Sequence, residues 1–75
     1  MNLEQQKKKT REFLRAIRSG NPDALARLVR HHARWAATDE RTVRLFVSLH
    51  DAQFAFAREQ GFASWSKLKA YAEPS

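Results

Sequence analysis

Basic side chains recur at helical spacing in the first half of this 75-residue chain. They follow one another at intervals of three or four residues in two sets, which are Lys8, Arg11, Arg15 and Arg18, then Arg27, Arg30 and Arg34. Arginine outnumbers lysine in the chain by nine to five, and a guanidinium group can hold a carboxylate or a phosphate through two parallel hydrogen bonds. The spacing therefore predicts a cationic face that binds an acidic partner, while a solvated face that keeps the chain soluble is the alternative.

The net charge is concentrated in the same half of the chain. Fourteen basic against eight acidic side chains give +6. Residues 1–38 carry nine of the basic side chains and three of the acidic ones, whereas residues 39–75 carry five of each. Because cations gathered on one part of a small surface attract phosphates and acidic proteins, an acidic protein surface is the expected partner and nucleic acid is the possible alternative.

The three histidines are the candidates for metal binding, and one group of a serine, a histidine and an aspartate is the candidate for catalysis. His31 and His32 are adjacent, so on a helix their side chains point about 100° apart and cannot share one ion without distortion. The chain has no cysteine, and we expect no metal site, no cofactor, and a packed, hydrogen-bonded His32. Ser48, His50 and Asp51 lie within one helical turn but point apart. We therefore expect no catalytic residues and no enzyme activity.

Two helices must carry the basic face. The first is predicted over residues 3–19, where apolar residues gather on one side and Gly20 provides the C-terminal stop. The second is predicted from Pro22 to about Trp35, because Asn21 is a good N-cap and proline is favoured at the first helical position. Each helix has an apolar side and a basic side, so packing of the apolar sides would leave the basic sides exposed.

The second half of the chain predicts a shorter pair of helices after an ambiguous segment. Residues 42–47 fit both a strand and a helix, and we expect a short helix or an extended packing segment, because a lone strand would leave backbone groups unpaired. The capping-box pattern at Ser48 and Asp51 opens a helix that is apolar nearly all round and is therefore expected at the centre. Gly61 suits the left-handed position after that helix, and a last helix is predicted over residues 65–72.

Together these elements predict one small all-α domain. It would be a bundle of four or five short helices arranged as two helical hairpins over residues 1–75, with residues 1–4 and 73–75 frayed. The expected core consists of large apolar residues, which are Phe13, Leu14, Ile17, Leu25, Leu28, Trp35, Phe46, Phe56, Phe62, Trp65, Leu68 and Tyr71. A chain of this size buries only about 60% of its unfolded surface, so a closed catalytic cavity is not expected.

The most distinctive stretch of the sequence covers residues 48–69. Its characteristic groups are Asp51-Ala52-Gln53, Ala57-Arg58-Glu59, Gly61-Phe62, Ser64-Trp65 and Leu68-Lys69. They resemble a short module, D-A-Q-x-x-x-A-R-E-x-G-F-x-S-W-x-x-L-K, that recurs in bacterial proteins described as ankyrin-repeat-like, although Ser66 stands where proline is usual. The resemblance implies a helical interaction fold and carries no catalytic residue with it.

The same stretch has the spacing of a DNA-binding helix-turn-helix. Ala57, Gly61, Ser66 and Leu68 are similarly placed in the motifs of arabinose-regulator-type activators. In that interpretation the last helix would present its polar side chains to bases and phosphates, and these are Ser64, Ser66, Lys67 and Lys69. The charge distribution argues against it, because the positive excess lies in the other half of the chain.

The sequence thus favours a non-enzymatic protein-interaction module that presents its basic face to an acidic protein, with a small basic nucleic-acid-binding protein as the alternative. A piece of a longer repeat protein, which would self-associate through an exposed apolar edge, is the third possibility. The longest apolar run, residues 54–57, is far shorter than the roughly 18 residues that span a bilayer, and no apolar signal region follows the N-terminus. We therefore expect a cytoplasmic protein without membrane contact.

Overall fold

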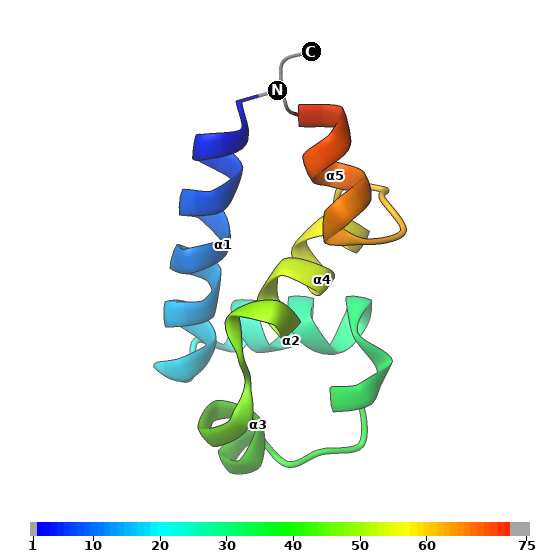
Figure 1. Ribbon diagram of the computed structural model, residues 1–75. Coiled ribbons are helices and arrows are strands. Elements are labelled where there is room, and N and C mark those ends of the chain that lie inside the picture. The colour runs from blue at the N-terminus through cyan, green and yellow to red at the C-terminus, as the bar shows by residue number, and fades with distance from the viewer. Residues whose placement is uncertain (1, 73–75) are drawn as a thin grey trace.

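The computed structural model describes residues 2–72, which fold into a small all-α bundle (Figure 1). Its helices are α1 (Leu3–Arg18), α2 (Pro22–His31), α3 (Glu40–Phe46), α4 (Leu49–Glu59) and α5 (Trp65–Ala72), with a short 3-10 helix, η1 (Ala33–Trp35), after α2. Within this part of the chain no strand forms. The predicted all-α class is confirmed. Fraying was predicted at residues 1–4 and 73–75, of which residues 1 and 73–75 lie outside the described residues, while Asn2 caps α1 and Leu3 and Glu4 belong to it.

Both glycines end helices as predicted. Gly20 and Gly61 have φ angles of +84° and +94°, a region that side chains rarely adopt. After α4, the amide of Phe62 donates to the carbonyl of Ala57 at 2.9 Å, the hydrogen bond that defines a Schellman turn. Each turn lets the next element start within a few residues, so the bundle needs no long loop at either place.

Polar N-caps fix where most of the helices begin. Four side-chain oxygens, those of Asn2, Asn21, Asp39 and Ser48, each accept a hydrogen bond from the backbone amide three residues further on. The predicted capping box is present, since the Asp51 carboxylate also accepts from the Ser48 amide. The Asp39 cap, which the sequence analysis did not use, resolves the ambiguous segment as the helix α3.

Helix α2 is shorter than predicted. It ends at His31, where His32 takes an extended conformation with φ −138° and ψ 92°, and the chain continues as η1 up to Trp35. The extended residue places the His32 ring 3.0 Å from the Asp51 carboxylate at the start of α4. The predicted continuous helix to Trp35 is therefore wrong in its last turn, although Trp35 is buried as expected.

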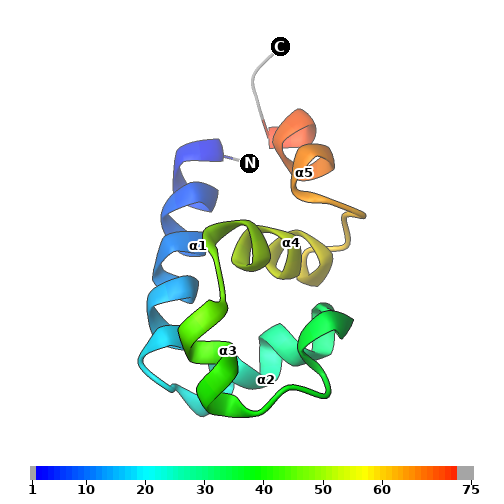
Figure 2. The same cartoon turned by 60° about the horizontal axis from the view of Figure 1, so that its bottom comes forward.

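Helix α4 occupies the centre of the bundle, as predicted. It packs against α1, α2 and α5, and both views show it between these helices (Figures 1 and 2). Three of its alanines, Ala52, Ala55 and Ala57, are almost completely buried and permit close approach of neighbouring helices. Helix α1 also packs against α2, and α4 against α5. The two helices of the first pair are not antiparallel neighbours, because α2 crosses α1 at a steep angle (Figure 1).

Two residues predicted for the core lie at the surface. Phe46 is 68% exposed and Tyr71 is 69% exposed. The inward positions of this segment belong to Val43 in α3 and to Val47, the C-cap that follows it, which are four residues apart and only 2% exposed each. Phe46 lies about 60° around the helix from Val43, on the side away from Val47, and α3 is too short to bury a wider stripe. The α3 segment therefore attaches to the bundle by two valines and leaves its other side chains outside.

Candidate interaction surface

The first basic set lies along the solvent side of α1. We call it the α1 row, and it consists of Lys8, Arg11, Arg15 and Arg18, all of which are exposed. The opposite side of the helix is buried through Phe13, Leu14 and Ile17. Among residues 2–72, the only ion pair formed from α1 is the one between Lys7 and Glu4, at 3.6 Å. The α1 row therefore presents its charge to solvent without a neighbouring carboxylate in contact.

Arg27, from the second basic set, is half-buried and is paired with a carboxylate of the bundle itself. Its Nε and Nη2 atoms donate to Oε2 and Oε1 of Glu59 on α4, at 2.7 and 2.6 Å. Its guanidinium carbon lies 4.4 Å from the centre of the Phe13 ring on α1. The hydrogen bonds from Arg27 lower the pKa of Glu59 below its ordinary value, and the same contact raises the pKa of Arg27. Arg27 thus joins three helices, and we leave it out of the interaction surface.

Arg30 and Arg34 are exposed but lie apart from the α1 row. Figures 1 and 2 show α2 running away from α1, so that its C-terminal end and η1 are on the far side of the bundle. Arg34 is placed over the Trp35 ring at 4.8 Å, and its Nη1 is 3.9 Å from the Asp51 carboxylate. The seven predicted contact residues therefore do not form one continuous face.

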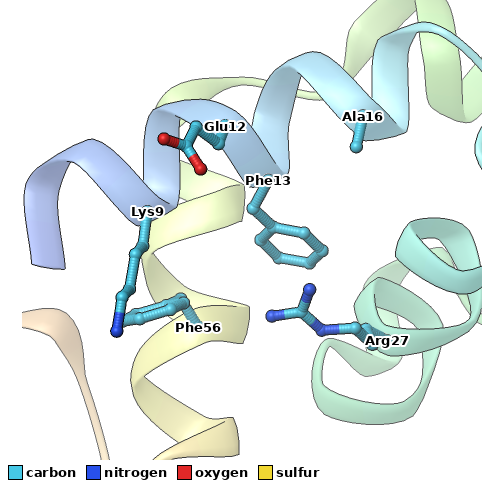
Figure 3. Close-up of a pocket in the computed structure, with 6 residues that line it drawn as sticks. All are labelled: Lys9, Glu12, Phe13, Ala16, Arg27 and Phe56. Carbon is cyan, nitrogen blue, oxygen red and sulfur yellow. The ribbon is translucent and has the colours of Figure 1, made fainter.

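A cleft of about 280 Å³ opens between α1, α2 and α4 (Figure 3). Its lining residues are Lys9, Glu12, Phe13, Ala16, Arg27 and Phe56. Figure 3 shows Lys9 reaching along one side towards Phe56, and Arg27 reaching towards Phe13 from across the cleft. Since the Arg27 guanidinium is already paired with Glu59, the cleft offers Lys9 as the cation for a ligand, and one such contact is too weak to assign a site.

Three arginines gather at the end of the molecule formed by α3, which the sequence analysis missed. Arg41 and Arg44 of α3 and Arg18 of the α1 row, together with Leu45, line a pocket of about 430 Å³. The Nε of Arg44 donates to the Arg18 carbonyl at 3.2 Å, and the Nη2 of Arg18 donates to the Val47 carbonyl at 3.1 Å. Each of these two side chains therefore satisfies the last carbonyls of the neighbouring helix.

A sequence signal for this cluster exists in hindsight. Arg41, Arg44 and Leu45 stand at positions i, i+3 and i+4, the spacing of one helix face, directly after the Asp39 cap. The equal numbers of acidic and basic residues in the second half of the chain concealed them. Arg18 comes from the first half and reaches them only because α3 packs against α1.

The alternative nucleic-acid-binding residues lie at the start of α5. Ser64 accepts a hydrogen bond from the Lys67 amide at 3.2 Å, so its oxygen caps the helix. Ser66 and Lys67 are exposed, and Lys69 is half-buried. Leu68, on the other side of α5, is completely buried. The structure thus leaves two of these four side chains, Ser66 and Lys67, open to a ligand.

His32 is packed and hydrogen-bonded, as predicted. Its Nε2 lies 3.0 Å from Oδ1 of Asp51, and its ring packs 4.8 Å from that of Phe54. Burial by itself would raise the pKa of Asp51, but the hydrogen bonds from Ser48 and from His32 outweigh it and lower this pKa below its ordinary value. His50 is exposed, and across residues 2–72 no three histidine or acidic side chains gather as a metal site would require.

The described helices and the comparisons with known proteins add two findings. No helix within residues 2–72 combines the length and the apolar character that crossing a membrane requires. No protein-family model, curated protein or solved structure matches the chain.

Proposed function

We propose that this chain is a non-enzymatic protein-interaction module that binds an acidic protein surface through the α1 row. The observation that carries the proposal is the exposure of Lys8, Arg11 and Arg15 on one side of a single helix, with no carboxylate within ion-pair distance in residues 2–72. Arg18 continues the row, and Arg30 and Arg34 are a separate outer contact. The resemblance of residues 48–69 to an ankyrin-like module also favours an interaction role, with the cytoplasm as the expected setting.

The α1 row can support binding because its cations act together. A single exposed ion pair contributes about 0 to 1 kcal/mol, so one such contact changes affinity less than tenfold. Several cations held on one rigid helix add their contributions without each having to be ordered separately, and they also accelerate association with an acidic surface. Binding through the row should therefore weaken as salt is added.

The test compares two charge reversals of equal size. Arg11→Glu with Arg15→Glu alters the α1 row, and Lys67→Glu with Lys69→Glu makes the same change in net charge on α5. The partner is captured from a lysate of the native host and identified by mass spectrometry, and its affinity for each variant is then measured. We expect the first variant to lose at least tenfold in affinity and the second to bind as the unaltered chain does. Equal losses, or no loss in the first variant, would reject the proposal.

A second candidate is nucleic-acid binding, favoured by the exposure of Ser66 and Lys67 beside the half-buried Lys69. A phosphate backbone could also use the α1 row. Titration of random duplex DNA with the chain at increasing salt tests this candidate directly, since phosphate contacts give measurable binding at low salt and an affinity that falls steeply as salt is added. Absence of binding at low salt removes this candidate, and binding lost only in the Lys67 and Lys69 variant assigns it to α5.

A further inference from the structure

The pocket at the α3 end has a chemistry that specifies its partner more closely than net charge does. We call it the α3 pocket, and it is lined by Arg18, Arg41, Arg44 and Leu45. We propose that it receives an acidic peptide segment of the partner, with a carboxylate held between the guanidinium groups and a neighbouring apolar side chain placed against Leu45. This inference rests on the proposed function, because it names the kind of segment that the acidic partner would contribute.

Two of the three guanidinium groups of the α3 pocket, those of Arg18 and Arg44, are positioned before any ligand arrives. Arg44 is fixed by its hydrogen bond to the Arg18 carbonyl, and Arg18 by its hydrogen bond to the Val47 carbonyl. The Arg44 guanidinium packs beside Gly20, since a Cβ there would lie 3.4 Å from its carbon, about the distance of an ordinary van der Waals contact. A guanidinium has five N–H donors, so one hydrogen bond each leaves most of them for a ligand. Prior ordering lowers the entropy lost on binding.

The positive charge of the α3 pocket is not neutralised by the protein itself. Among residues 2–72, none of the ion pairs involves Arg18, Arg41 or Arg44. Arg27 provides the contrast, because its guanidinium is completed by the Glu59 carboxylate. Three guanidinium groups around one pocket without a carboxylate form a site that a carboxylate from another chain can complete.

The apolar surface at the same place favours a peptide over a nucleic acid. Leu45 lines the pocket, and it and Phe46 are each 68% exposed. One exposed leucine is ordinary on a protein surface, but here it borders the arginine cluster. A phosphate backbone would engage the arginines and leave Leu45 in water. A segment that alternates acidic and apolar side chains would cover both kinds of group, as the charge and the apolar area of the pocket require.

The experiment selects peptides on the intact chain. A displayed library of random twelve-residue peptides is enriched on the immobilised protein, and the enriched sequences are synthesised for affinity measurement. We expect sequences with two or more acidic residues within about four positions of Leu, Ile or Phe. Their affinity should fall at least tenfold in Arg41→Glu and about threefold to tenfold in Leu45→Ser. Lys67→Glu is the matched charge control and should change it by less than twofold. Circular dichroism of each variant checks that its helix content is unchanged.

Several outcomes would overturn the inference. They are enrichment of no peptide, enrichment of peptides without acidic residues, and affinities that Arg41→Glu leaves unchanged. Duplex DNA or pyrophosphate could also bind the chain. If Arg41→Glu weakens that binding and Leu45→Ser does not, the pocket is assigned to phosphates instead. If the native partner is lost by reversal at Arg11 and Arg15 but retained by Arg41→Glu, the proposed function stands and this inference fails.

Discussion

Some arginines of this small protein are paired with a carboxylate of the same chain, and others are not. At the junction of α2 and α4, Arg27 is held by both carboxylate oxygens of Glu59 and lies over the Phe13 ring. At the α3 end, Arg41 and Arg44 belong to no ion pair within residues 2–72. The residue type is the same, and what differs is whether the fold brings a carboxylate to it.

The comparison shows where polar groups contribute to stability and where they remain available for binding. The junction contains a second satisfied pair, His32 with Asp51, which is more deeply buried than Arg27 with Glu59. At the α3 end the segment is attached by two valines, and Arg44 donates to the backbone carbonyl of Arg18 rather than to a carboxylate. Substitutions in the junction should therefore lower the free energy of unfolding, while equivalent substitutions at the α3 end should mainly affect binding.

The largest expected effect is the removal of the Asp51 carboxylate. Asp51→Ala removes a buried carboxylate. That carboxylate is the acceptor for the Ser48 amide, the Ser48 hydroxyl and the His32 ring. Loss of a helix cap together with a charge-assisted hydrogen bond costs about 2 to 4 kcal/mol. Urea unfolding followed by circular dichroism measures this loss in the free energy of unfolding.

The matched control for that prediction is Asp39, the N-cap of α3. Asp39 accepts from the amide and the hydroxyl of Thr42, as Asp51 does from Ser48, but it is exposed, and within residues 2–72 its carboxylate accepts no hydrogen bond from another helix. Asp39→Ala should cost clearly less than Asp51→Ala. Equal losses would show that the two regions do not differ in the way we infer.

A smaller effect is expected when the two arginine settings are compared directly. Arg27→Ala removes a bidentate pair and the packing on Phe13, and we expect a loss of about 1 to 2 kcal/mol, since the pair is partly exposed. Arg41→Ala removes the same side chain at the α3 end and should change the free energy of unfolding by less than about 0.5 kcal/mol. Urea unfolding of both variants under one condition makes the comparison, and a larger loss in Arg41→Ala would contradict it.

The features that the sequence predicted are those set by residues close in the chain. Gly20 and Gly61 each end a helix within a few residues, and the capping box of Ser48 and Asp51 spans one turn. Local backbone chemistry decides such features, so a single sequence is enough to find them. The spacing of apolar residues, which is also read from neighbours in the chain, gave the all-α class and the central position of α4.

The features that the sequence did not predict depend on residues brought together from a distance. Arg27 and Glu59 are 32 positions apart, and Arg18 and Val47 are 29 apart. Helical periodicity places Arg18 and Arg27 on the polar side of a helix, but it does not show which groups lie opposite them. That is why Arg27 was assigned to the interaction surface, and why the α3 pocket was not found before the packing of α3 on α1 was known.

The smallest expected effect is a difference in acid sensitivity caused by Glu59. Its pKa is lowered in the folded chain, first by the hydrogen bonds from Arg27. As the pH falls below the ordinary value of about 4.5, the unfolded chain takes up the proton first, so the stability that the pair provides above that pH is lost as the pH passes down through the lowered pKa. The pKa of Asp51 is lowered as well, so the whole junction should weaken in acid in the same direction.

Glu59→Gln separates the contribution of Glu59 from that of Asp51. The variant keeps an oxygen that can accept from Arg27 but cannot be protonated in this range. We expect it to be less stable than the unaltered chain at pH 6 by less than about 1 kcal/mol, because the pair is partly solvated, and we expect that gap to narrow by pH 3. Urea unfolding at pH 6, 4.5 and 3 measures the gap. A gap that stays constant with pH would mean that the charge of Glu59 does not stabilise the junction, which would remove the distinction between Arg27 and the arginines of α3.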